Sequence, residues 1–170
     1  MDNIIIGGGC FWCIEAAFKE VEGVKSVTSG YAGGHTEDPS YREVCSGDTG
    51  HAEVVKIEYN DEVVGLDRLL ELFFKIHNPT TKNREGPDIG SQYRSIILYH
   101  NPEQKERIEA FIEEVQKEYE DEIVTEVEEL QQFYQAEEKH QDYFKKNPED
   151  AYCKMHAAPK VKKAKEHSKK

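Results

Sequence analysis

The chain has 170 residues, of which 33% are charged and 37% are hydrophobic, and its formal net charge is −12. This length predicts one domain with a sizeable core. The acidic body argues against nucleic acid as the main partner. No apolar run is long enough to span a membrane. Residues 1–3 carry no basic region ahead of the first apolar run, so we expect no secretory signal and a cytoplasmic, reducing setting.

The first six predicted elements follow in the order strand, helix, strand, strand, helix, strand. They lie at residues 4–6, 11–20, 24–31, 52–59, 66–77 and 93–99. Two long polar loops, at residues 35–50 and 80–92, separate them, and loops of this length are often functional. The order is typical of a ferredoxin-like split β-α-β arrangement, an α/β (α+β) fold in two layers with both helices on one face of an antiparallel sheet.

The remaining elements are predicted as additions to this sheet. They are a helix at residues 102–119, a short edge strand at 124–127 and a last helix at 137–146. From residue 151 onward the sequence shows no periodicity, and residues 160–170 hold six lysines and one glutamate. We therefore expect a single catalytic domain over residues 1–150 and a mobile tail, with a basic end, over residues 151–170.

The chain is organised around a strand that ends in three glycines and is followed at once by a helix. Cys10 comes first after the glycines, at the start of that helix. Unpaired N–H groups and the helix dipole favour a thiolate there. A buried packing role for Cys10 is the alternative, but packing requires no glycine run. A phosphate-binding turn is disfavoured because neither the third glycine of the dinucleotide motif nor Gly-Lys-Ser/Thr follows.

The expected strand order brings several reactive side chains toward one pocket. These are Cys10, Tyr41, Glu53, Asp88 and Tyr93, which lie in or next to the two loops and the first turn. A thiolate can attack an electrophilic centre, a carboxyl can deliver a proton, and phenol groups can hold an oxygen. Each also has a structural interpretation: half-buried tyrosines, a solvated glutamate and a turn aspartate are all common.

Four motifs occur in order along the chain and together carry a family resemblance. They are GCFW at residues 9–12, GYAGG at 30–34, YREVCSGDTGHAE at 41–53 and GSQYRS at 90–95. Over about residues 3–153 the sequence closely resembles peptide methionine sulfoxide reductase A. Family members reduce the S epimer of methionine sulfoxide, free or in peptides, consistent with one reductase for each epimer.

The resemblance implies a role for each pocket residue. Cys10 is the nucleophile that attacks the sulfoxide sulfur and becomes a sulfenic acid. Glu53 is the acid that protonates the sulfoxide oxygen, Tyr41 and Tyr93 hydrogen-bond that oxygen, and Asp88 supports the site.

The resemblance also indicates the substrate pocket and the partners. Phe11 and Trp12 match the pocket for the S-methyl group. We expect no bound cofactor or metal, an external thiol reductant such as thioredoxin or dithiothreitol, and a monomer. Cys45 is expected to be structural, because its loop presents Tyr41 and Glu53.

The sequence departs from the family at the resolving cysteine. Many members have glycine where Cys13 stands, and carry a glycine-rich tail with two cysteines. This chain instead offers Cys153 in the tail and Cys13, one helical turn from Cys10. We favour Cys153, because a mobile tail can bring a thiol to the sulfenic acid, and keep Cys13 as the alternative.

Two other functions fit part of the pattern. A thioredoxin-like disulfide oxidoreductase would use Cys10 and Cys13, but it leaves Glu53 and Tyr41 without a role. A zinc-binding module is a second alternative, with ligands Cys10, Cys13, Cys45 and Cys153 or a histidine. The irregular spacing of the cysteines argues against it.

Overall fold

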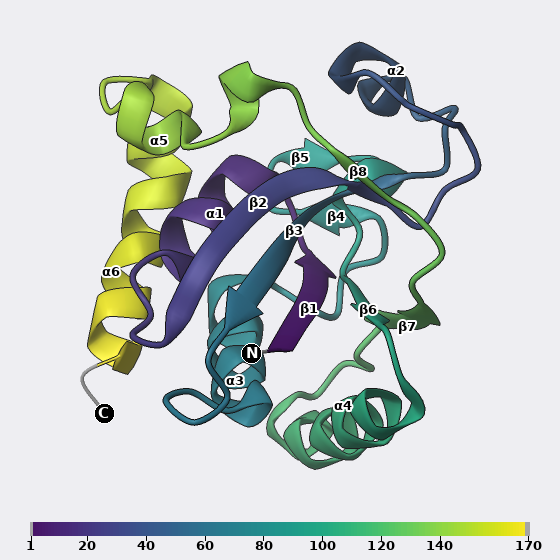
Figure 1. Cartoon of the computed structure of the whole chain (residues 1–170), viewed down its shortest axis with the longest axis vertical. Coiled ribbons are helices and arrows are strands. Elements are labelled where there is room, and N and C mark those ends of the chain that lie inside the picture. Colours follow the sequence, from purple (N-terminus) through teal and green to yellow (C-terminus); the bar gives the residue numbers. More distant parts are fainter. Residues whose placement is uncertain (1, 169–170) are drawn as a thin grey trace.

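A six-stranded sheet forms the centre of the computed structural model, which describes residues 2–168 (Figure 1). Its strands are β1 (Asp2–Gly7), β2 (Val24–Ala32), β3 (Ala52–Tyr59), β6 (Ile96–Tyr99), β7 (Glu126–Glu129) and β8 (Phe133–Gln135). Their spatial order is β7-β6-β1-β3-β2-β8. The inner four, β6-β1-β3-β2, pair antiparallel throughout. This is the predicted split β-α-β order, so the α/β fold is confirmed.

The main helices lie on one side of this sheet, and the last of them packs on two of the others. They are α1 (Phe11–Phe18), α3 (Leu66–Ile76), α4 (Pro102–Val115) and α6 (Ala158–Ser168). Because strand side chains alternate, Ile4 and Ile6 join the large core beneath the helices. Ile5 faces the opposite side, in a small cluster that Leu130 and Phe133 cover.

Short elements fill the two long loops that the sequence indicated. They are α2 (Tyr41–Cys45), the hairpin β4 (Arg84–Glu85) and β5 (Asp88–Ile89), and a 3₁₀-helix at Ser91–Tyr93. Ser40 begins α2 with a capping box, accepting from Glu43 N while the Glu43 carboxylate accepts from Ser40 N. The polar loops are therefore ordered by local hydrogen bonds that a hydrophobic pattern does not show.

The end of the chain differs most from the prediction. The helix expected at residues 137–146 is a 3₁₀-helix at Glu138–His140 followed by α5 (Tyr143–Lys146). Where no regular structure was expected, the structure has a π-helix at Cys153–Ala157 that continues into α6, so that expectation is wrong, while the mobility of the tail and the domain boundary at residue 150 stay predictions. Residues 169–170 of the predicted tail lie outside the described residues.

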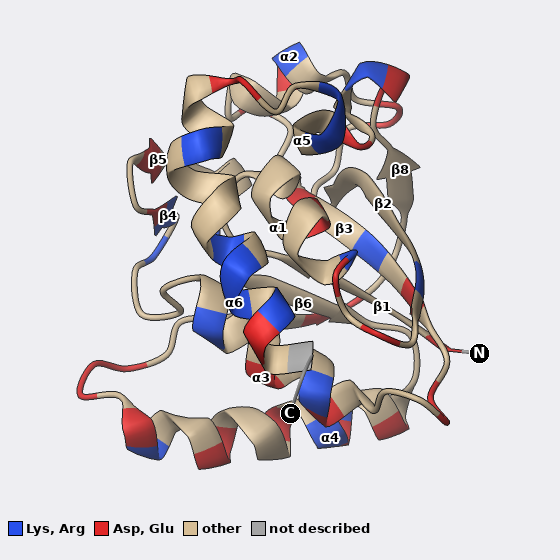
Figure 2. Ribbon diagram, turned by 90° about the vertical axis from the view of Figure 1, so that its left-hand side faces the viewer, with Lys and Arg blue, Asp and Glu red and all other residues tan. Residues whose placement is uncertain are grey.

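The reason for this difference is the composition of the buried face of α6. Ala164 and His167 of α6 face the core among many lysines, as does Ala157 at the end of the π-helix, so no large apolar residue marks the helical period. Small residues allow α6 to pack closely against α1 and α3. Figure 2 shows the lysines along α6 on the outer side of this layer. Within residues 2–168, no helix is both long and apolar enough to span a bilayer.

Candidate active site

The glycine turn between β1 and α1 sets the position of Cys10. Cys10 is the N-cap of α1, with φ −69° and ψ 130°, and is 6% exposed. A Cβ on Gly8 would lie 2.8 Å from the ring of His77, and Gly9 adopts φ +88°. Gly9 N donates to the carbonyl oxygen of Tyr93 at 3.0 Å. The glycines therefore allow a close backbone approach that ties Cys10 to the loop carrying Tyr93.

Glu53, at the start of β3, is fully buried beside the first turn of α1. Phe11 N donates to its Oε1 at 3.1 Å, while its Oε2 has no hydrogen-bond partner among residues 2–168. Burial raises the pKa of Glu53 to about 8, and the nearby charge of Asp88 adds to the effect. At neutral pH this carboxyl therefore holds a proton, next to the residue that follows Cys10.

The Cys10 thiol is less acidic than its place at a helix start indicated. Burial is the largest cause that raises the pKa of Cys10, followed by a hydrogen bond with Cys13 and the charge of Glu53. The same hydrogen bond lowers the pKa of Cys13. Desolvation thus outweighs the helix N-terminus, because the sulfur lies in the core cluster rather than at the surface. The two thiols lose their first proton as a pair.

Tyr41 and Tyr93 come together at this site from α2 and the 3₁₀-helix. Burial raises the pKa of the Cys45 thiol, and the neighbouring hydroxyls of Tyr41 and Tyr93 oppose that rise. Burial, followed by the charge of Glu53, raises the pKa of both tyrosines, so both remain phenols. Cys45 lies at the end of α2, next to both side chains, and the structural role expected for it stays a prediction.

Glu137 is a positioning residue that the sequence did not indicate. Its Oε2 accepts from Tyr41 N and its Oε1 accepts from the Tyr31 hydroxyl, both at 2.9 Å. Tyr31 pairs with Glu53 in the register of β2 and β3. Glu137 therefore fixes the loop that carries Tyr41 to the strand beside the buried carboxyl. A contact across about a hundred residues leaves no local signal in the sequence.

Phe11 and Trp12 form an aromatic wall with residues from the end of the chain. Phe11 is fully buried, and the Trp12 ring stacks on Tyr143 with 3.7 Å between centroids and 8° between planes. Trp12 Nε1 donates to His140 Nδ1 at 3.1 Å, and the His140 ring lies 4.2 Å from that of Tyr41. His140 and Tyr143 were not identified from the sequence, where they sit in a polar stretch with no distinguishing pattern.

Asp88 lies on β5, on the side of the site that faces the C-terminal segment. The Tyr152 hydroxyl donates to Asp88 Oδ2 and also hydrogen-bonds to the Cys13 thiol. Cys153 follows directly, is fully buried, and lies in the same core cluster as Cys10 and Cys13. Burial raises the pKa of Cys153 to about 12. Beside the hydroxyls of Tyr41 and Tyr93, the C-terminal segment thus brings the Tyr152 hydroxyl and the Cys153 thiol close to the Cys10–Cys13 pair.

All four cysteines are free thiols. Among the described residues, no group of three or more histidine, cysteine or acidic side chains is arranged to hold a metal ion. The structure therefore brings together the thiols, the buried carboxyl and the two tyrosines, and places Phe11, Trp12 and Asp88 around them. A thiol beside a protonated carboxyl and two phenols can attack an electrophile whose oxygen is held and protonated.

Comparisons with known proteins agree with this arrangement. The family model described as peptide methionine sulfoxide reductase matches residues 2–170. The peptide methionine sulfoxide reductase MsrA of Natronomonas pharaonis is 64% identical over 163 residues, covering 95% of this chain and 92% of the relative. The reduced form of Mxr1 from Saccharomyces cerevisiae superposes with a TM-score of 0.86 at 37% identity, covering 91% and 90% of the two chains. The same yeast protein in complex with Trx2 gives a TM-score of 0.60 at 27% identity, covering 84% of each chain.

Proposed function

The chain belongs to the peptide methionine sulfoxide reductase A family, and from this premise we propose that it reduces the S epimer of methionine sulfoxide, free and in polypeptides. It is an oxidoreductase that converts methionine sulfoxide to methionine. In our proposal the electrons come from thiols of the protein and then from an external thiol. No bound cofactor or metal takes part.

The observation that carries this proposal is the state of Glu53. Its carboxyl is fully buried, has a pKa raised to about 8, and directs one oxygen to Phe11 N. The other oxygen has no partner among residues 2–168 and is free to give its proton to a bound oxygen. A sulfoxide oxygen can accept this proton, and its protonation makes the sulfoxide sulfur more electrophilic.

In the first step, the sulfur of Cys10 attacks the sulfoxide sulfur. Glu53 donates a proton to the sulfoxide oxygen, while the hydroxyls of Tyr41 and Tyr93 hold that oxygen as charge develops on it. As the sulfur–sulfur bond forms, the thiol of Cys10 releases its proton, which replaces the proton that Glu53 has given up. The hydroxyl group then moves to Cys10 while the sulfur–oxygen bond of the substrate and the sulfur–sulfur bond break, so Cys10 becomes a sulfenic acid and methionine departs. Oxidation of one thiol balances reduction of one sulfoxide.

The pocket residues support this step through shape and charge. Phe11 and Trp12 provide an apolar wall for the S-methyl group, and contacts of this wall with His140 and Tyr143 hold it in place. Asp88 orients the Tyr152 hydroxyl at the edge of the site. Because the wall is asymmetric about Cys10, the two sulfoxide epimers present their oxygen and methyl group to different surroundings.

In the second step, the Cys153 thiol attacks the sulfenic acid, water leaves, and a disulfide forms between Cys10 and Cys153. Cys13 is the alternative partner, since it already hydrogen-bonds to Cys10. A dithiol protein of the thioredoxin class then reduces the disulfide by exchange. The yeast relative in complex with Trx2 supports this class of reductant.

A stereochemical assay tests the proposed function. Purified protein is given each epimer of methionine sulfoxide with dithiothreitol as reductant, and methionine is quantified. We expect the S epimer to be consumed and the R epimer to remain, and Cys10→Ser to abolish the reaction. Equal consumption of both epimers, or activity in the serine variant, would contradict the proposal.

A further inference from the structure

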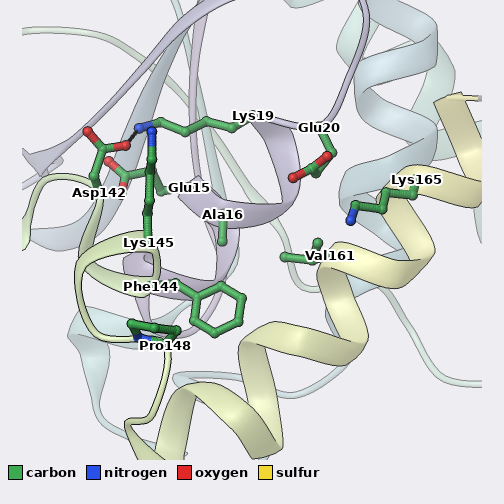
Figure 3. Close-up of a pocket in the computed structure, with 10 residues that line it drawn as sticks. All are labelled: Glu15, Ala16, Lys19, Glu20, Asp142, Phe144, Lys145, Pro148, Val161 and Lys165. Atoms are coloured by element: carbon green, nitrogen blue, oxygen red, sulfur yellow. Dashed lines mark ion pairs between the residues drawn. The ribbon is translucent and has the colours of Figure 1, made fainter.

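A cavity of about 590 Å³ lies beside the aromatic wall, between α1, the segment around α5, and α6 (Figure 3). Ala16, Phe144, Pro148 and Val161 give it an apolar lining from all three elements. Three carboxylates and three lysines surround this lining, so the cavity carries no net charge. Its volume is in the range of ligand-binding pockets.

The cavity adjoins the proposed catalytic site through shared elements. Trp12 and Ala16 lie four residues apart on α1, so their side chains share one face of the helix. Tyr143 stacks on Trp12, while its neighbour Phe144 lines the cavity. Glu15 of α1 also lines the cavity, and α1 packs directly against α5. Tyr143, which covers Trp12, and Phe144, which lines the cavity, therefore belong to one connected structure.

The separation between the cavity and Cys10 corresponds to a short stretch of polypeptide. Ala16 follows Cys10 by six residues, which is about 9 Å along a helix that rises about 1.5 Å per residue. An extended chain advances about 3.3 Å per residue, so about three residues span that distance. A substrate residue at that spacing reaches the cavity when the oxidised methionine is at Cys10.

We propose that this cavity binds an apolar side chain of a polypeptide substrate, about three residues from the oxidised methionine. This inference rests on the proposed function and names the substrate feature that the same site recognises. The apolar lining fits an uncharged aliphatic or aromatic side chain. The balanced rim, which includes an ion pair between Lys19 and Asp142, gives no net attraction for an anion or a cation.

Peptides of one length test the inference directly. Each contains one methionine S-sulfoxide among glycines and serines, with leucine or aspartate placed in turn at each of four positions on either side. We expect one position, about three residues from the sulfoxide, to give a kcat/KM about tenfold higher with leucine than with aspartate, as partial burial of a leucine allows. A wild-type series with no such position would overturn the inference without any variant.

Two matched variants then assign the preference to the cavity. Ala16→Leu fills the cavity, and Ala110→Leu makes the same change at an exposed position of α4. We expect Ala16→Leu to abolish the leucine preference and to leave reduction of free methionine sulfoxide within twofold, while Ala110→Leu changes neither. A leucine preference that survives Ala16→Leu overturns the inference. The same holds if Ala16→Leu leaves the preference intact and raises only the KM for thioredoxin, because the cavity would then contact the reductant and not the substrate. If the wild-type protein reduces neither free nor peptide-bound methionine sulfoxide, the proposed function itself is contradicted.

Discussion

Replacing Glu53 by glutamine removes the proposed proton donor while keeping the size of the side chain. The glutamine oxygen can still accept from Phe11 N, as Glu53 Oε1 does at 3.1 Å. The amide can hydrogen-bond a sulfoxide oxygen but cannot transfer a proton to it. The variant therefore isolates proton transfer from binding.

The expected loss of rate follows from the usual contribution of a general acid to catalysis and from the pKa of Glu53. Loss of general acid catalysis costs about 10²- to 10⁴-fold in rate. Since the pKa is about 8, the wild-type carboxyl is about ten to one protonated at pH 7 and about one to ten at pH 9. We expect Glu53→Gln to slow the reduction step at least about 100-fold at pH 7.

Single-turnover measurements separate this step from recycling. Excess enzyme is mixed with methionine sulfoxide in the absence of reductant, and methionine formation is followed from pH 6 to pH 9.5. The wild-type rate should fall as Glu53 loses its proton near pH 8, and the glutamine variant should lack that fall. A variant rate within about threefold of wild type at pH 7, or an unchanged fall near pH 8, would refute the assignment of Glu53 as the acid.

Glu53→Gln should slow the reaction but stabilise the folded protein. The pKa of Glu53 rises from 4.5 to about 8 on folding, so between these values the folded state holds a proton that the unfolded state has released. Stability therefore declines as pH rises through this window, by on the order of 4 kcal/mol for a shift of this size. Glu53→Gln lacks this decline. Urea unfolding should show the variant gaining stability over wild type from pH 5 to pH 8, and an equal pH dependence of both proteins would contradict the raised pKa.

Two pairs of variants test the remaining chemistry and the turn. Cys153→Ser should give one methionine per enzyme but no recycling by thioredoxin, whereas Cys13→Ser should retain turnover; normal turnover by Cys153→Ser would assign resolution to Cys13. Gly8→Ala places a Cβ 2.8 Å from the His77 ring and should destabilise the protein by about 1–3 kcal/mol in thermal unfolding. Gly65→Ala, where a Cβ meets nothing within 4 Å, is its control, and an equal loss in both would contradict the packing argument.

Local patterns were sufficient to predict much of the fold. The strand predicted at residues 52–59 matches β3, and the apolar stripe at 66–77 matches α3 to within one residue. Helix α3 buries one strongly apolar face, and β3 carries buried apolar residues on both faces of the sheet, so both patterns are visible in the sequence. The helix at the end of the chain was missed because its buried positions include small residues, Ala157 in the π-helix and Ala164 in α6. Small residues pack well but contribute little to a hydrophobic period.

The site was predictable where its residues lie in motifs, and not where it depends on contacts across the chain. Cys10, Glu53 and Tyr93 lie near one another, as the strand order implied. The cover that Tyr143 places over Trp12 joins residues 131 positions apart, and no local pattern indicates it. The raised pKa of Cys10 is likewise a consequence of burial, which depends on the packed tertiary structure.

The features of this site that cost free energy of folding lie at or beside the glycine turn between β1 and α1. A glycine run loses more conformational entropy on folding than any other sequence of that length. Glu53 is buried with one unpartnered oxygen, and Cys10 is buried as a thiol that resists ionisation. The glycine run and the unpartnered oxygen of Glu53 destabilise the fold, whereas the neutral Cys10 thiol packs as a small apolar group. All three serve the proposed chemistry, through close approach of the backbone, a proton held at neutral pH, and a sulfur shielded from water. The apolar core beneath α1 and α3 offsets these costs, which explains why such a site lies at the centre of the sheet and not at its edge.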